Sequence, residues 1–257
     1  MRIDIFFIII FFSFFHSYGQ KRNQDDFLKK QFSKNNQYIN YRILEPYHKT
    51  NDDVPLFIFL HGAGERGDDN EKQLAHGSRF FLEQTEKKEY NSYVVLPQCP
   101  DNNRWSYHKV DPWLKGIQES KNKDISYYGS LVIELIENLI ENKNIDPNRI
   151  YISGLSMGGY GTFDLVSHRN DLFAAAAPIC GGSDLALLEK AVDVPFWIFH
   201  GDLDRVVPVE KSRDAFNFLI NKRNHHKYTE YIGVYHNSWE NVFEETDYFM
   251  WLFSNFR

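Results

Sequence analysis

The segment RIYISGLSMGGYG, Arg149 to Gly161, sets the fold that the rest of the chain must fit. RIYIS is typical of a strand, and residues 157–169 are predicted to form a helix despite their glycines. Between them lies G-x-S-x-G, in which Gly154 and Gly158 flank Ser156. Small neighbours let a strand turn sharply into a helix, so that the serine hydroxyl projects above the sheet. The pattern predicts a nucleophilic serine; a Gly-Ser turn kept for packing is the alternative.

Strands and helices alternate on both sides of this motif. The predicted strands are QYINYRILEP (37–46), VPLFIFLH (54–61), SYVVLPQ (92–98), RIYIS (149–153), FAAAAPICGG (173–182), VPFWIFHGD (194–202) and HKYTEYIGVYH (226–236). The predicted helices are 78–88, 125–144, 157–169, 208–222 and 238–256. This alternation predicts an α/β fold, with a mostly parallel sheet covered by helices on both faces. We expect one domain over residues 37–257, preceded by a loose polar leader at 20–36.

The N-terminal segment, residues 1–19, is predicted to be a signal peptide. An arginine near the start precedes an apolar block from Ile5 to Phe15, which is too short to span a bilayer. The small residues Ser17 and Gly19 then resemble a cleavage site. An uncleaved anchor is the alternative, and either interpretation predicts an exported protein, secreted or periplasmic. No later segment has the apolar length of a membrane span.

A nucleophilic serine requires a base, and the base requires an acid that orients it. After this kind of turn the acid and then the histidine follow in sequence, both beyond the carboxyl ends of strands. His236 is the one histidine that meets both conditions. Asp202 and Asp204 follow VPFWIFHG; we favour Asp204, because it lies further into the loop. Asp202 adjoins Gly201 and is expected to brace the turn, and Asp184 is a distant third candidate.

The stretch FLHGAGERGDD (59–69) contains the spacing G-x-G-x-x-G. Such glycines indicate either a dinucleotide-binding turn or main-chain donors for an oxyanion. A dinucleotide turn requires an acidic residue at the end of the next strand, which here ends in LPQCP. The two aspartates of the stretch would also repel a pyrophosphate. We therefore interpret it as an oxyanion loop that donates the N–H of Ala63 or Gly64, with Met157 supplying the second donor.

Four motifs occur in order along the chain: HGAGE, GLSMGG, HGDLDRVVP and GVYHNSW. Together they resemble the α/β-hydrolase superfamily, in particular secreted esterases of the feruloyl esterase, polyhydroxybutyrate-depolymerase-like and dienelactone-hydrolase-like groups. The resemblance covers about Val54 to the C-terminus. It implies the α/β-hydrolase fold and a serine hydrolase of carboxylic esters that needs no cofactor. The substrate it implies is a small ester or an acyl group on a polysaccharide.

The resemblance also implies a role for each matching residue. It makes Ser156 the nucleophile, His236 the base, Asp204 the acid, and Ala63 and Met157 the oxyanion donors. One departure is Tyr235, where such sequences often have glycine before the histidine. That tyrosine is expected to narrow the site.

Two groups of residues near the predicted site are candidates for substrate contact. Glu65 and Arg66 follow the oxyanion loop, where they either touch substrate or pair with each other at the surface. Trp105, Tyr107 and Trp113 lie in a long irregular segment at the active edge. Their rings form either the wall of a binding pocket or the small core of the loop itself.

Composition and missing motifs weigh against other functions. A net charge of −6 and a pI near 5.9 disfavour nucleic-acid binding. H-E-x-x-H and C-x-x-C are absent, so no metal site is predicted. In the strand order of the resembled fold, Cys99 and Cys180 follow strands about 14 Å apart. That separation exceeds the reach of a disulfide, and no bridge is expected.

Two other functions remain as alternatives. A serine peptidase of the prolyl-oligopeptidase type has the same order of parts, but its usual propeller domain does not fit in 257 residues. A non-catalytic binding module on the same scaffold usually lacks a triad member, and none is missing here.

Overall fold

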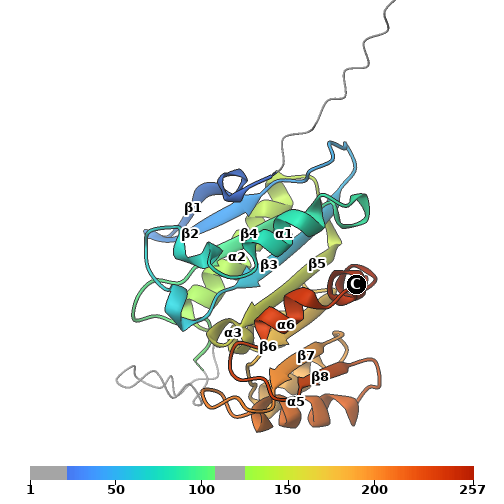
Figure 1. Cartoon of the computed structure of the whole chain (residues 1–257). Helices are drawn as coiled ribbons and strands as arrows, with labels where there is room; N and C mark the ends of the chain where they lie inside the picture. Colours follow the sequence, from blue (N-terminus) through green and yellow to red (C-terminus); the bar gives the residue numbers. More distant parts are fainter. Residues whose placement is uncertain (1–21, 108–124) are drawn as a thin grey trace, which may run out of the picture.

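The computed structural model describes residues 22–107 and 125–257 (Figure 1). The predicted signal peptide and Trp113 lie outside these ranges. Among the described helices, none combines the length and the apolar character needed to cross a bilayer.

The described residues form an eight-stranded sheet in the order β1-β2-β4-β3-β5-β6-β7-β8. Its strands are β1 (Leu28–Lys34), β2 (Gln37–Leu44), β3 (Val54–Leu60), β4 (Tyr93–Gln98), β5 (Ile145–Leu155), β6 (Ala175–Ile179), β7 (Trp197–Gly201) and β8 (Lys227–Tyr231). From β4 to β8 all neighbours are parallel, whereas β2 runs antiparallel to both β1 and β4. The prediction of a mostly parallel sheet is confirmed.

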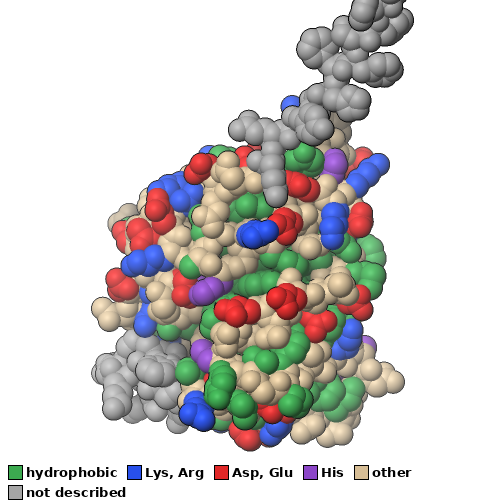
Figure 2. All heavy atoms as spheres, viewed as in Figure 1, with side chains coloured by type: hydrophobic (Ala, Val, Ile, Leu, Met, Phe, Trp, Pro, Cys, Tyr) green, Lys and Arg blue, Asp and Glu red, His purple; other side chains and the backbone are tan. Residues whose placement is uncertain are grey.

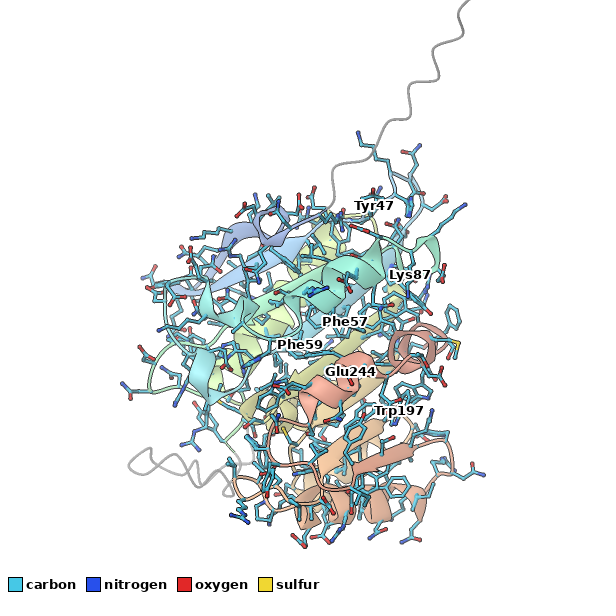
Figure 3. The ribbon with its side chains drawn as sticks, viewed as in Figure 1. Tyr47, Phe57, Phe59, Lys87, Trp197 and Glu244 are labelled. Atoms are coloured by element: carbon cyan, nitrogen blue, oxygen red, sulfur yellow. The ribbon has the colours of Figure 1, made fainter. Side chains whose placement is uncertain are left out.

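Helices cover both faces of the sheet. They are α1 (Ser78–Thr85), α2 (Tyr127–Asn142), α3 (Met157–His168), α4 (Leu185–Leu188), α5 (Glu210–Ile220), α6 (Trp239–Glu244) and α7 (Tyr248–Phe253). Every residue of the central strand β3 is buried, because successive side chains point to opposite faces and both faces are covered. Leu56 and Ile58 pack into the core under α2, α3 and α5. Phe57 and Phe59 pack on the other face against Phe81 of α1 (Figure 3).

Both ends of the described chain differ from the sequence prediction. Much of the predicted loose leader is β1, which pairs in register along β2, so that expectation was wrong. The side chains of β1 are exposed or half-buried, so its sequence lacks the apolar run by which a buried strand is predicted. The predicted last strand ends at Tyr231 and turns at Gly233, whose φ is +78°. The predicted closing helix is two short helices, α6 and α7, with extended backbone at Glu245 between them.

On the face drawn in Figure 2, acidic and basic side chains are interspersed among hydrophobic ones. Within the described residues, this face has no broad basic surface of the kind that nucleic-acid binding requires.

Candidate active site

Ser156 lies on the sharp turn between β5 and α3. Its φ of 54° and ψ of −114° fall outside the regions that residues with a side chain usually adopt. A hydrogen bond to β6 fixes the turn: the N–H of Ser156 donates to the carbonyl of Ile179 at 2.9 Å. Backbone strain of this kind is concentrated at functional sites, where the surrounding structure maintains it.

The two glycines of the motif allow the turn to approach β3. A Cβ at Gly158 would lie 1.9 Å from the carbonyl oxygen of Leu60. A Cβ at Gly154 would lie 2.5 Å from the carbonyl oxygen of Gly158. No side chain fits at either position, so the sequence G-x-S-x-G is required by backbone contact.

Ser156, His236 and Asp204 are joined by hydrogen bonds. Nε2 of His236 lies 2.9 Å from Oγ of Ser156, and Nδ1 of His236 lies 2.7 Å from Oδ2 of Asp204. The three residues follow β5, β8 and β7 respectively, all at the carboxyl edge of the sheet. The structure thus brings together the three side chains that the sequence singled out.

The Asp204 carboxylate is fully buried and accepts hydrogen bonds at both oxygens. Oδ1 accepts from the N–H groups of Val206 and Val207 at 2.8 and 2.9 Å. Burial alone would raise the pKa of Asp204, but hydrogen bonds from His200, His236 and these main-chain groups hold it well below its usual range. Asp204 is therefore ionised at neutral pH.

The other two aspartates have different partners. Oδ1 of Asp202 accepts from the N–H of Gly233 at 2.7 Å, and so ties the loop after β7 to the loop that carries His236. Asp184 caps α4 by accepting from Ala186 at 2.8 Å. Of the three candidates, Asp204 is the one that contacts His236.

The loop after β3 lies beside Ser156. Gly62, Ala63 and Gly64 line the same small cavity as Ser156 and His236. Ala63 begins the 3-10 helix η2 (Ala63–Glu65) and Met157 begins α3. The first N–H of a helix has no acceptor in a preceding turn, so both groups are available as donors.

His61, which the sequence analysis did not single out, holds this loop in place. Its Nδ1 donates to the carbonyl of Gly62 at 2.6 Å, and its Nε2 accepts from the N–H of Cys99 at 2.9 Å. Burial lowers the pKa of His61 to about 4. The neutral ring satisfies both partners, since a proton on Nε2 would face another N–H. In the sequence, the histidine that begins HGAGE is the feature from which this role could have been predicted.

Trp105 supports the same loop from within the core. It is 0% exposed, and its indole N–H donates to the carbonyl of His61 at 3.0 Å. The prediction that Trp105 contacts substrate is therefore wrong, and its place agrees with the alternative of a small loop core. The hydroxyl of Tyr107 likewise has a partner within the protein, because it accepts from the N–H of Tyr127 at 3.3 Å.

Glu65 faces the cavity but does not pair with Arg66. Oε1 of Glu65 lies 3.5 Å from Nε2 of His76, whereas Nε of Arg66 donates to the carbonyl of Ala63 at 2.9 Å. Burial alone would raise the pKa of Glu65, but the His76 hydrogen bond and the nearby His61 ring lower it overall. The cavity therefore contains a carboxylate at neutral pH.

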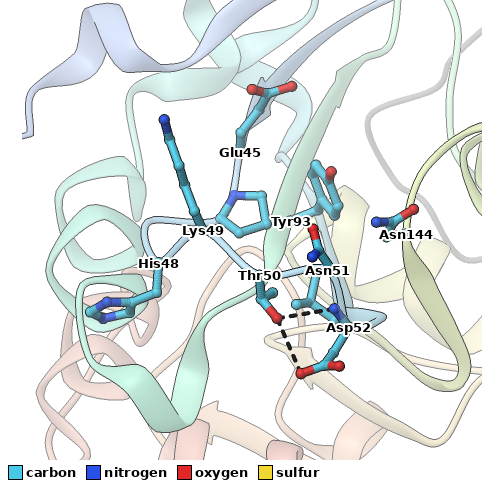
Figure 4. Close-up of a pocket in the computed structure, with 10 residues that line it drawn as sticks. Glu45, His48, Lys49, Thr50, Asn51, Asp52, Tyr93 and Asn144 are labelled. Carbon is cyan, nitrogen blue, oxygen red and sulfur yellow. Dashed lines mark hydrogen bonds between the residues drawn. The ribbon is translucent and has the colours of Figure 1, made fainter.

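The cavity beside Ser156 measures about 180 Å³. The Trp239 ring lies between two imidazoles, 5.1 Å from His76 and 5.5 Å from His236. A larger cavity of about 500 Å³ lies at the opposite edge, near the starts of β3, β4 and β5 (Figure 4). Its described side chains include no hydrogen-bonded serine and histidine, so chemistry rather than size identifies the smaller cavity as the candidate site.

Cys99 and Cys180 are buried and not joined to each other. Strands β3 and β5 lie between β4 and β6, which these cysteines follow. Burial raises the pKa of both thiols. Over residues 22–107 and 125–257, one group of three potential metal ligands occurs, Cys180, Asp204 and His236, within 4.8 Å of one another. The hydrogen bond between Asp204 and His236 already accounts for that proximity.

Residues 40–253 match the family model for phospholipases and carboxylesterases. The chain belongs to this phospholipase/carboxylesterase family. A solved thermostable esterase is 37% identical with a TM-score of 0.83, over 91% of this chain and 64% of that chain. The predicted membership of the α/β-hydrolase superfamily is confirmed. A solved ferulic acid esterase, 15% identical with a TM-score of 0.63 over 88% of this chain and 96% of its own, shares the fold.

Curated relatives of this family member match over a shorter stretch. Poly(3-hydroxyalkanoate) depolymerase C from Paucimonas lemoignei is 34% identical over 35% of this chain and 20% of its own length. A bifunctional acetylxylan esterase/xylanase from Neocallimastix patriciarum is 33% identical over 36% of this chain and 13% of its own length. The chain thus spans one fifth or less of these relatives.

Proposed function

We propose that this family member is an exported hydrolase of carboxylic esters. Ser156 is the nucleophile, His236 the general base and Asp204 the acid that orients it. The observation that carries the proposal is the unbroken chain of hydrogen bonds from Oγ of Ser156 through His236 to Asp204. Export rests on the apolar block from Ile5 to Phe15 and the small residues that follow it.

Each proposed step uses one contact of the site. As Oγ of Ser156 attacks the ester carbonyl, Nε2 of His236 takes its proton, and Asp204 stabilises the imidazolium. The N–H groups of Ala63 and Met157 then donate to the oxyanion, and each such donor is worth about 3 kcal/mol in the transition state. His236 returns the proton to the departing alcohol. Water attacks the acyl enzyme by the same route and releases the acid.

The size and charge of the cavity favour a short, neutral acyl ester whose alcohol carries hydroxyl groups, such as an acylated carbohydrate. A cavity of about 180 Å³ accommodates a small group. The ionised Glu65 accepts hydrogen bonds from hydroxyl donors and repels anionic groups, a phospholipid phosphate among them. The resemblance to an acetylxylan esterase/xylanase supports this class of substrate.

Labelling by a fluorophosphonate and an ester panel test the proposal. We expect wild-type protein to be labelled and to hydrolyse acetyl, butyryl, feruloyl and hydroxybutyryl esters to different extents. Ser156→Ala should abolish labelling and lower kcat by about 10⁵-fold, since the catalytic residues act as a unit. Ser183→Ala is the control, because Ser183 follows β6 at the same edge of the sheet. This variant should retain both fluorophosphonate labelling and ester hydrolysis.

Two results would contradict the proposal. A folded wild-type protein that resists the label and hydrolyses no ester indicates a binding module. Hydrolysis of a prolyl anilide without any ester indicates a peptidase of the prolyl-oligopeptidase type. A Pyrococcus horikoshii acylaminoacyl peptidase, 18% identical with a TM-score of 0.62, shares the fold with this chain, so the anilide belongs in the panel.

A further inference from the structure

His200, near the end of β7, is a second imidazole on the Asp204 carboxylate. Its Nε2 lies 3.1 Å from Oδ2 of Asp204, the same oxygen that Nδ1 of His236 approaches to 2.7 Å. The side chains of His200 and Asp204 are 0% exposed, whereas that of His236 is 20% exposed. His200 therefore contacts the acid from inside the protein, on the side away from the substrate cavity.

The partners of His200 determine where its protons are. Nε2 faces two acceptors, Asp204 and the carbonyl of Val207 at 3.0 Å, so it must carry a hydrogen. Nδ1 lies 2.7 Å from Oγ of Ser212 on α5, and that hydroxyl also lies 3.1 Å from the carbonyl of Gly181. Ser212 has one hydrogen to donate. Whichever acceptor receives it, the N–H at Nε2 of His200 remains.

We propose that His200 is a positioning residue of the active site: it donates its Nε2–H to Asp204 and holds the carboxylate in the orientation that receives Nδ1–H of His236. The inference rests on the proposed ester hydrolysis. Val206 and Val207 hold Oδ1 only. His200 supplies the contact that fixes Oδ2 from within the core.

The same contact affects the pH dependence of catalysis. Without His200, Oδ2 of Asp204 is no longer held toward Nδ1–H of His236, so its interaction with the imidazolium that forms during catalysis changes. The acidic limb of the kcat/KM profile should therefore move when the donor is removed.

Other charged groups around this cluster do not produce such a shift. Burial keeps the Cys180 thiol protonated by raising its pKa, and a hydrogen bond from Arg213 lowers the pKa of Glu230 on β8. Arg205, in the loop after β7, lies over the Tyr235 ring at 5.5 Å. On the cavity side, Glu65 lines the same cavity as His236, and the Trp239 ring lies between the rings of His76 and His236. All of these groups are unchanged in the variants below, so their effects cancel in the comparison.

Two amide substitutions separate positioning from packing. The Gln side chain in His200→Gln places an N–H donor near the position of Nε2, whereas the shorter side chain in His200→Asn reaches toward Ser212 but not Asp204. We expect His200→Asn to lower kcat by at least about tenfold with KM within about twofold, because a hydrogen bond to a charged group is lost. The acidic limb of its kcat/KM profile should move relative to wild type. His200→Gln should restore kcat to within about threefold of wild type.

The outcomes separate this inference from the proposed function. A wild-type protein that hydrolyses no ester contradicts the proposed function. An active wild type whose folded His200→Asn variant keeps kcat and an unmoved pH profile overturns the positioning role. Equal losses of kcat in folded His200→Asn and His200→Gln overturn it as well, because the N–H donor of the glutamine then does not restore activity.

A measurement on the wild type keeps the inference testable if the variants do not fold. Nitrogen-15 NMR of labelled histidine, with resonances assigned through His236→Asn and Asp204→Asn, should show a protonated Nε2 on His200 across the pH range of activity. A His200 ring protonated at Nδ1 alone contradicts the proposed donation to Asp204.

Discussion

The two edges of the sheet both contain a cavity lined by ionisable side chains, yet they differ in how those side chains are paired. At the amino edge, Glu45 forms an ion pair with Lys143 at 3.2 Å. Thr50 in the same region bonds to Asp52, two residues away (Figure 4). At the carboxyl edge, the buried Asp204 is linked through His236 to Ser156. The first edge has separate pairs near the surface, and the second has a connected series leading from the core to a cavity.

Strand direction explains the difference. Because β3, β5, β7 and β8 are parallel, the loops that follow them meet at one edge, and each contributes a residue from a distant part of the chain. Cavity size therefore does not identify the candidate site. What distinguishes the carboxyl edge is the connection of a serine, an imidazole and a buried acid beside the loop that follows β3. Three substitutions or titrations test how far this arrangement depends on fit and charge.

The largest effect is expected from Gly158→Ala. The added Cβ would meet the carbonyl oxygen of Leu60 at 1.9 Å, so the turn would have to move away from β3. We expect a loss of about 3 kcal/mol or more in the free energy of unfolding, together with loss of ester hydrolysis. Gly64→Ala is the matched control for stability, because a Cβ there meets nothing within 4 Å. Denaturant unfolding of both variants checks this, and equal stabilities would show that close approach to β3 is not required.

A smaller effect is expected from protonation of His61 at the carboxyl edge. Its folded pKa of about 4 lies below the ordinary value of 6.5, so the unfolded chain binds more protons between these values. The stabilisation is complete above pH 6.5 and is lost as the pH falls toward 4, by about 3 kcal/mol in all. Urea unfolding from neutral to acidic pH should show this slope in wild type and a flatter one in His61→Asn. Parallel slopes would contradict the assignment of the pH dependence to this buried ring.

The smallest effect should come from the two cavity glutamates. Glu65→Gln removes the carboxylate beside Ser156, and we expect KM for an acylated sugar to rise about tenfold, since a charge-assisted hydrogen bond becomes a neutral one. Hydrolysis of an anionic ester such as a hemisuccinate should improve. Glu45→Gln is the matched control in the cavity at the amino edge, where loss of an exposed ion pair should leave kinetics unchanged and stability within about 1 kcal/mol. Similar kinetics in the two variants would remove Glu65 from substrate recognition.

Much of the site was predictable because its residues lie in short motifs with local mechanical reasons. Ser156 was identified from its flanking glycines, and His236 from its place after the last strand. Positions that depend on contacts distant in sequence were missed. Trp105 has the side chain expected of a pocket wall, but it is buried, and its indole N–H donates to the carbonyl of His61 in the loop after β3. The β1 strand was missed because it is stabilised by pairing with β2 rather than by an apolar pattern.

The sequence by itself determined the alternation of strands and helices and the strand-to-helix turn at Ser156, because each is set by neighbours within a few residues. The order in which the acid and the histidine follow Ser156 was also predictable, because each comes after a recognisable strand. Tertiary structure alone decided which partner each polar side chain has. His200 contacts Asp204 rather than substrate, and Glu65 pairs with His76 rather than Arg66. Such pairings depend on which loops the parallel strands bring together, and hydrogen bonds between buried groups extend only about 3 Å, a distance that no local pattern encodes.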